Sequence, residues 1–293
     1  MKRLALSSLC VILGVSIAAS EPASADPLKV TAAENFYGDV ARQIGGSNVE
    51  VTSILSSPDQ DPHLFEASPS TAKTLADARI VIMNGADYDP WMEKLLAANK
   101  SPNRQVIVVA QLAHKKSGDN PHLWYDPANV KAMAGRLDSV LGTVDPAHKA
   151  DYEKNTTTFL AGLKPLEDKI AQMKHRYAGT PVTASEPVFG YMAQLLGLKM
   201  RNERFQLAIQ NDTEPSISDV AAFEADLKGH KVKAMLYNSQ ASEAAVQKLV
   251  DLAKSEKVPV VPITETEPEG KTYVEWMTSQ LDALDAALGG ATK

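Results

Sequence analysis

Two hydrophobic patterns alternate along the chain from residue 28 onward. Short apolar runs rich in β-branched residues begin at 28, 49, 79 and 105. Amphipathic stretches, such as STAKTLADA from residue 70 and WMEKLLAA from residue 91, separate them. Strands that alternate with helices predict parallel βαβ units. Residues 26–145 are therefore predicted to form an N-terminal α/β lobe that ends in a helix near 128–141.

Residues 146–177 interrupt this alternation because they contain no strand pattern. Their apolar residues recur every three, four or seven positions, which predicts one stripe along a helix of roughly 30 residues, about 45 Å long. Pro146 suits the first turn of this linking helix, whereas Pro165 lies inside it and should kink it. The stripe consists of Tyr152, Phe159, Leu163, Leu166, Ile170, Met173 and Tyr177.

The alternation resumes after Gly179 and predicts a C-terminal α/β lobe over residues 178–293. Strands are expected at 181–185, 232–238 and 259–263, and helices at 187–196, 216–228, 242–255 and about 272–288. The predicted fold class is α/β, with two βα lobes joined by a single long helix. Such an arrangement predicts a ligand site in the cleft between the lobes.

The first 25 residues have the features of a signal peptide. Lys2 and Arg3 precede an apolar run from Leu4 to Ala19, and small residues at 23–25 form a cleavage site near Ala25–Asp26. The only cysteine, Cys10, lies within the apolar run, so the exported chain would contain no disulfide. A signal peptide together with an exported chain that has no cysteine favours a location in a bacterial periplasm.

The net charge of the full chain is -6, and no basic stripe is visible. We therefore expect no nucleic-acid partner.

Two of the six histidines occur in similar loops. His63 lies in Asp-Pro-His-Leu-Phe-Glu and His122 in Asn-Pro-His-Leu-Trp-Tyr. The proline restricts the backbone before the imidazole, and the aromatic residue after it can anchor the loop, which pre-positions a metal ligand. The other four histidines, His114, His148, His175 and His230, lie in polar contexts and are expected to be exposed.

The second lobe supplies two candidate carboxylates. Glu186 and Glu265 each follow a predicted strand, and the loops beyond the carboxyl ends of parallel strands form the binding crevice of such folds. Glu186 could instead favour a helix N-terminus. Glu267 and Glu269 are close enough to Glu265 to be alternative ligands, although we expect both to be solvated.

Two imidazoles and two carboxylates would suit a borderline or hard divalent cation, namely zinc or manganese. Ligand imidazoles usually donate their second N–H to an acceptor. Glu66, Asn120 and Asp126 are candidates for that role, whereas the tryptophans are expected to pack the lobes. The sequence contains no HExxH motif and no dense His-x-His-x-Asp cluster, so we predict a binding protein and not a metallohydrolase.

Several segments together resemble the metal-binding solute-binding proteins of zinc and manganese ABC importers. The resemblance rests on residues 61–66, NGADYDPWMEKLL at 84–96, Asn-Pro-His-x-Trp at 120–124, SEPVFGY at 185–191 and the long central helix. It covers essentially the whole exported chain.

The resemblance implies that His63, His122, Glu186 and Glu265 bind one Mn²⁺ or Zn²⁺ ion, which is passed to a membrane permease. Glu265 occupies the place of an Asp in this family, and a Glu at position 186 is typical of the manganese-binding members. We expect a monomer that is not an enzyme. A metal chaperone or adhesin with the same fold is the alternative.

Overall fold

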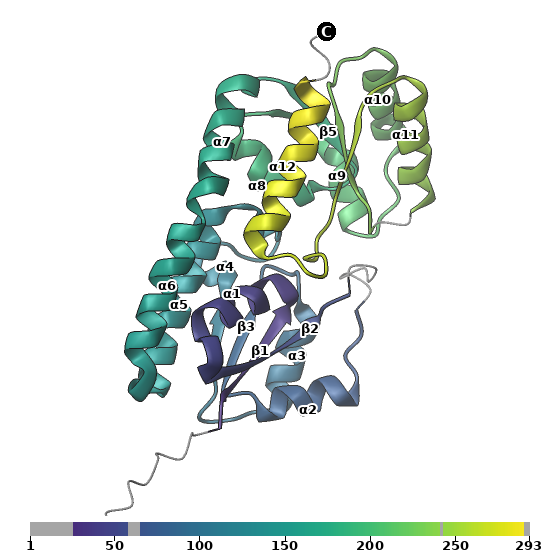
Figure 1. Ribbon diagram of the computed structural model, residues 1–293. Coiled ribbons are helices and arrows are strands. Elements are labelled where there is room, and N and C mark those ends of the chain that lie inside the picture. The colour runs from purple at the N-terminus through teal and green to yellow at the C-terminus, as the bar shows by residue number, and fades with distance from the viewer. Residues whose placement is uncertain (1–25, 58–64, 241–242, 290–293) are drawn as a thin grey trace, which may run out of the picture.

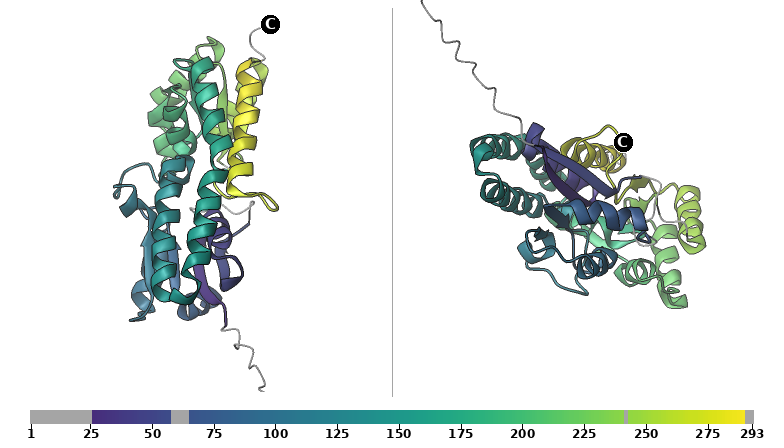
Figure 2. Two further views of the ribbon diagram at one scale, coloured as in Figure 1. Left: turned by 60° about the vertical axis from the view of Figure 1, so that its left-hand side comes forward. Right: turned by 90° about the horizontal axis from the view of Figure 1, so that it is seen from below.

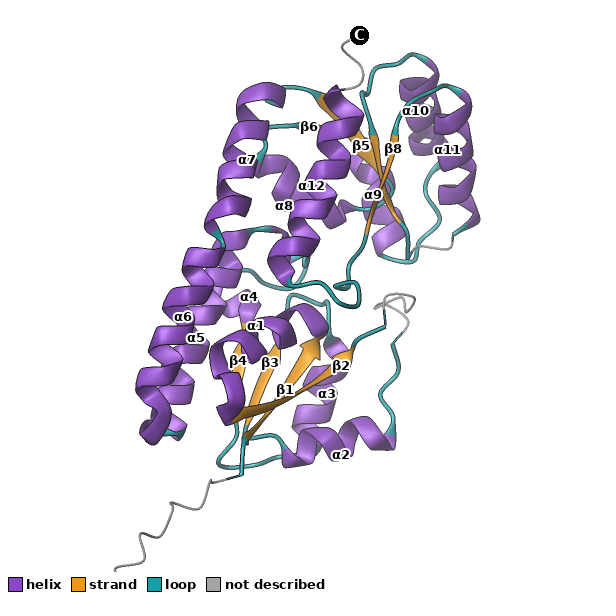
Figure 3. Ribbon diagram, in the orientation of Figure 1, coloured by secondary structure: helices purple, strands orange, loops and turns teal. Residues whose placement is uncertain are grey.

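Two lobes stand one above the other, each built on a four-stranded parallel sheet (Figures 1 and 3). The computed structural model describes residues 26–57, 65–240 and 243–289. The predicted signal peptide and His63 lie outside these ranges. No helix within them is both long and apolar enough to cross a membrane. The predicted α/β fold class is confirmed.

The N-terminal lobe has the strand order β2-β1-β3-β4, with all neighbours parallel. The carboxyl ends of these strands face the second lobe (Figure 3). The strands are β1 (Leu28–Glu34), β2 (Val49–Leu55), β3 (Ile80–Met83) and β4 (Gln105–Val108). The helices are α1 (Asn35–Gly45), α2 (Pro69–Asp77), α3 (Pro90–Ala98), the short α4 (Val109–Leu112) and α5 (Pro127–Val144).

The C-terminal lobe repeats this topology with the order β6-β5-β7-β8. Its strands are β5 (Pro181–Ala184), β6 (Lys199–Arg201), β7 (Met235–Asn238) and β8 (Val260–Ile263). Its helices are α8 (Gly190–Leu195), α9 (Glu203–Gln210), α10 (Ile217–Lys228), α11 (Ala244–Ser255) and α12 (Tyr273–Gly289). The sequence pattern did not predict β6, because the short segment Lys-Met-Arg has no buried apolar run.

The connection between the lobes consists of two successive helices, α6 (Lys149–Gly162) and α7 (Lys164–Tyr177). The break falls at Leu163, as expected for a Pro165 that lacks the N–H of a continuous helix. Leu163 keeps right-handed helical angles, so α7 continues the course of α6 along one side of both lobes (Figure 2). The predicted apolar stripe is buried, except for the half-buried Tyr177.

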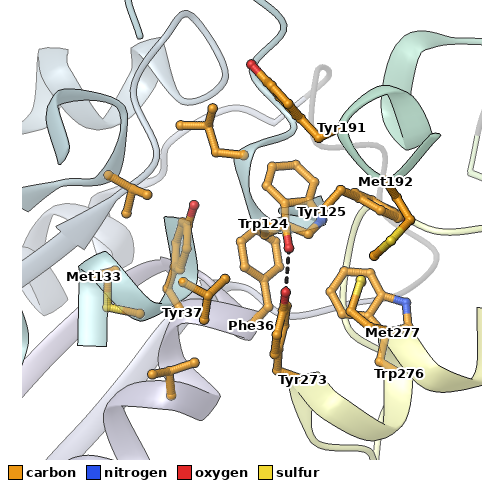
Figure 4. Close-up of a cluster of buried hydrophobic side chains, with 14 of the residues drawn as sticks. Phe36, Tyr37, Trp124, Tyr125, Met133, Tyr191, Met192, Tyr273, Trp276 and Met277 are labelled. Carbon is orange, nitrogen blue, oxygen red and sulfur yellow. Dashed lines mark hydrogen bonds between the residues drawn. The ribbon is translucent and has the colours of Figure 1, made fainter. Parts of the chain in front are cut away.

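A second connection is an apolar core that runs through both lobes without interruption. Phe36 on α1 stacks on Trp124 with 4.4 Å between ring centroids (Figure 4). Tyr125 meets Phe189 of the other lobe at 5.6 Å between centroids. The Tyr273 hydroxyl on α12 donates a hydrogen bond to the Trp124 carbonyl at 2.7 Å. The lobes are therefore joined by packed aromatic side chains as well as by α6 and α7.

Replacing Tyr273 with Phe should lower the free energy of unfolding by about 1–3 kcal/mol, because the Trp124 carbonyl loses a buried donor. Urea unfolding measures this change. Tyr177→Phe is the matched control, since the Tyr177 hydroxyl on α7 also bonds a residue of α12, Asp285, but this bond is only part-buried. An equal loss in both variants would contradict the importance of the buried bond.

Candidate functional site

His122 lies at the junction of the two lobes and is fully buried. It precedes a 3-10 turn over Leu123–Tyr125, and its ring packs edge-on against Trp124 at 5.4 Å between centroids. The carbonyl of Pro121 accepts a hydrogen bond from the Asn84 side chain at 2.8 Å. The Asn84 side chain in turn accepts one from the Tyr37 hydroxyl. The loop is therefore held by groups of the first lobe.

The orientation of the His122 ring is set by Asn120. Asn120 Oδ1 lies 2.7 Å from His122 Nδ1 and also accepts the His122 backbone N–H at 3.1 Å. Asp126, the other candidate partner, instead accepts the Ala128 N–H and caps α5. Glu66 is exposed. Because the amide oxygen can only accept, Nδ1 carries the proton and Nε2 is directed toward the second lobe.

Two buried carboxylates of the second lobe meet at this point. Glu265 Oε2 lies 3.3 Å from His122 Nε2, and both side chains are essentially inaccessible. Glu186 is also buried and is joined to Glu265 through Asn238, whose Nδ2 donates to Glu265 Oε1 at 2.7 Å and to Glu186 Oε1 at 3.1 Å. The structure thus places His122 beside Glu265 and links Glu265 to Glu186 through Asn238, while His63 lies outside the described residues.

All three of these polar groups of the second lobe come from the ends of neighbouring parallel strands. Glu186 follows β5, Asn238 ends β7 and Glu265 follows β8. Side chains at the carboxyl ends of adjacent parallel strands converge on the same edge of the sheet. The Gln240 N–H donates to Asn238 Oδ1 at 3.1 Å, which keeps the Asn238 amino group directed at both carboxylates.

Tyr88 completes the first-lobe side of the site. Burial, followed by the charge of Glu265, raises the pKa of Tyr88, and its hydroxyl hydrogen-bonds that carboxylate. The preceding residues Gly85, Ala86 and Asp87 all have positive φ, a costly conformation for residues other than glycine. Asp89 holds this turn by accepting the Asn84 and Gly85 N–H groups at 2.7 Å.

Glu34 and Asp89 form a buried carboxyl pair behind Tyr88. Both side chains are almost completely inaccessible, and the charge of Asp89 opposes ionisation of Glu34. Burial, then the charge of Asp89, raises the pKa of Glu34 well above its ordinary value, and burial raises the pKa of Asp89 to about 6. Both buried acids therefore hold their protons to a higher pH than exposed acids do.

Glu267 is buried, contrary to the expectation that it would be solvated, whereas Glu269 is exposed. The Glu267 backbone exchanges two hydrogen bonds with the Asn35 side chain, at 2.6 and 3.0 Å. Burial raises the pKa of Glu267 to about 9, and the charges that act on its carboxyl come from Asp39, Arg42 and Glu275, not from His122. Glu267 therefore belongs to the contact between α1 and the turn before α12.

The remaining histidines lie away from this site. His114, His175 and His230 are exposed as expected, while His148 is half-buried and hydrogen-bonded to Asp145 at 2.7 Å. Trp91, Trp124 and Trp276 pack in the core, as predicted. Within residues 26–57, 65–240 and 243–289, no group of three or more His, Cys, Asp or Glu side chains is placed so that it could hold a metal ion.

The sequence argument missed Asn238 and Tyr88. Asn238 lies at the carboxyl end of a predicted strand, near the same sheet edge as Glu186 and Glu265, so its position along the strand could have identified it. Tyr88 lies in the segment NGADYD, whose turn residues gave no sign of which side chain would face the other lobe.

The fold and the site define a two-lobed binding protein with a buried polar site between its lobes. Residues 30–287 match the family described as zinc-uptake complex component A, periplasmic. The chain therefore belongs to this family, the substrate-binding components of metal ABC importers.

Relatives with different stated metals match the chain over nearly its whole length. It is 23% identical to the manganese ABC transporter substrate-binding lipoprotein PsaA of Streptococcus mitis, over 96% of each chain. It is also 23% identical to the iron ABC transporter substrate-binding lipoprotein MtsA of Streptococcus pyogenes, over 97% of this chain and 96% of the relative.

Among solved structures, the periplasmic zinc-binding protein TroA of Treponema pallidum has the same fold. It aligns with a TM-score of 0.75 and 19% identity, over 89% of this chain and 99% of TroA. At this identity the likeness supports the architecture alone.

The buried carboxyl pair makes stability depend on pH. The raised pKa of Glu34 means that the folded protein keeps a proton which the unfolded chain loses above about pH 4.5, so stability falls as pH rises. Glu34→Gln does not titrate and should reduce the fall in unfolding free energy between about pH 5 and about pH 8. Urea unfolding at both pH values measures it, with the exposed Glu50→Gln as control. An unchanged fall in Glu34→Gln would contradict the raised pKa of Glu34.

Proposed function

We propose that this protein captures a divalent transition metal, Mn²⁺ or Zn²⁺, in the periplasm and delivers it to the membrane permease of an ABC importer. The family supports this function, and the relatives carry manganese or iron in their names. In this proposal the exported chain begins near Asp26 and acts as a monomer. It binds its cargo and catalyses no reaction.

The proposed ligands are His122, Glu186 and Glu265, with His63 as the fourth. One observation carries the proposal: His122 Nε2 and Glu265 Oε2 come from opposite lobes and lie 3.3 Å apart in a buried position. Two ligand atoms about 2.1 Å from one tetrahedral zinc ion would be separated by about 3.4 Å. The support for His63 is its Pro-His loop, which matches that of His122.

The donor set limits the metal to borderline and hard ions. Imidazole nitrogen and carboxylate oxygen suit zinc and manganese, and a site without sulfur disfavours copper(I). Carboxylates that bind through both oxygens raise the coordination number toward the one manganese prefers. Metal analysis of protein isolated from its native periplasm distinguishes the two, because zinc outbinds manganese at most such sites in vitro.

Replacing His122 with Ala should abolish metal-induced stabilisation. Metal at about 100 times its Kd stabilises a folded protein by about 2.7 kcal/mol, and the melting temperature should rise by several degrees in the wild type. Thermal unfolding with and without Mn²⁺ or Zn²⁺ tests this, with the exposed His114→Ala as the matched control. A full rise in His122→Ala would remove this residue from the site.

Replacing each of two neighbouring acids tests whether Glu265 or Glu267 is the ligand. Glu265→Ala should weaken metal binding by about tenfold or more, because it removes a proposed ligand oxygen, the one that lies beside His122. Glu267→Ala should bind metal nearly as well as the wild type, since its carboxyl faces Asp39 and Arg42. Competition with a chelating dye gives both affinities. The reverse order would transfer the ligand role to Glu267.

A further inference from the structure

We propose that Asn120 is a positioning residue that couples the orientation of His122 to the contact between the two lobes. This inference rests on the proposed metal site and adds a contact that holds the His122 ring in the orientation needed to bind the metal. Its basis is a single amide side chain that contacts the histidine with one atom and the opposite lobe with the other.

Both ends of the Asn120 amide are engaged. Oδ1 accepts from the His122 backbone and faces the ring Nδ1, while Nδ2 donates to the Pro187 carbonyl of the second lobe at 2.8 Å. These contacts determine which way the amide points. The opposite orientation would place Oδ1 against the Pro187 carbonyl oxygen and Nδ2 against the His122 N–H, so both hydrogen bonds would be lost.

The contact to the second lobe lies beside a proposed ligand. Pro187 directly follows Glu186, so Asn120 links the histidine loop to the carboxylate loop across the lobe junction. The Tyr191 hydroxyl adds a second link by donating to the Asn120 carbonyl at 2.7 Å. Separating the lobes at this edge requires breaking both bonds, and it would release the amide that holds Nδ1 of His122.

Glycine at position 190 makes room for this arrangement. A Cβ on Gly190 would lie 2.7 Å from Asn120 Nδ2, closer than such atoms approach in proteins. The backbone of Gly190 has φ -57° and ψ -48°, which alanine adopts readily in a helix. Gly190→Ala should therefore displace the Asn120 amide from the opposite lobe without straining its own backbone.

An aspartate at position 120 could accept from His122 but could not donate to the Pro187 carbonyl. The amide therefore provides both functions, and its neutral oxygen orients the imidazole without adding another negative charge to a site that already contains two buried carboxylates. The presence of Asn at this position follows from its role between the lobes.

The experiment compares Asn120→Ala, Gly190→Ala and Tyr191→Phe in the full exported chain. Affinities for Mn²⁺ and Zn²⁺ are measured by competition with a chelating dye. Asn120→Ala and Gly190→Ala should each weaken binding by about tenfold or more, as expected when a ligand loses its outer hydrogen-bond partner. Tyr191→Phe removes a different bond between the two lobes but leaves the Asn120 amide in place, so its loss of metal affinity should be clearly smaller.

A second readout needs no metal. Nitrogen-15 NMR of the metal-free protein reports which ring nitrogen of His122 carries the proton. The wild type and Tyr191→Phe should show it on Nδ1, whereas Asn120→Ala and Gly190→Ala should populate the form protonated on Nε2. Combining Asn120→Ala with Gly190→Ala should add no further loss of affinity, because both changes remove the same contact.

Wild-type affinity and an unchanged histidine signal in Asn120→Ala would overturn the inference. Equal effects of Tyr191→Phe and Asn120→Ala on both readouts, or additive losses in the double variant, would also overturn it. Near-UV circular dichroism identifies any variant that fails to fold, and Gly190→Ala then still tests the contact. Failure of the proposed function is recognised separately, since the wild type would then bind neither metal.

Discussion

The structure depends on holding two carboxylates and an imidazole together in an interior that excludes water. Burying Glu186 and Glu265 beside His122 is unfavourable, because charged groups lose their hydration and the two acids repel each other. The donors described at these carboxylates, Asn238 and Tyr88, are neutral. They orient the carboxylate oxygens, and a divalent cation bound there would compensate the charge of both acids.

Such a site needs a rigid surrounding, since its three groups come from two lobes. The aromatic core around Trp124 and Tyr125 is continuous between the lobes, and α6 and α7 pass along both of them. Protein interiors are closely packed and resist small displacements. The junction therefore resists displacement of one lobe relative to the other.

Buried acids outside the proposed metal site have a different role. Glu34 and Asp89 lie buried near Tyr88, and Glu267 lies in the contact between α1 and the segment before α12. Each raised pKa follows from burial without a positively charged partner in direct contact. These groups link the stability of the first lobe and of the lobe junction to pH without contributing ligand atoms.

The sequence by itself determined the two α/β lobes, the helical connection with its break near Pro165, and the positions of His122, Glu186 and Glu265. These features depend on local periodicity, on proline geometry and on the rule that sites lie at the carboxyl ends of parallel strands. The tertiary structure decided which neutral side chains contact His122, Glu186 and Glu265. The choice of Asn120 over Asp126, the burial of Glu267 and the roles of Asn238 and Tyr88 depend on contacts between distant segments, which no local pattern encodes.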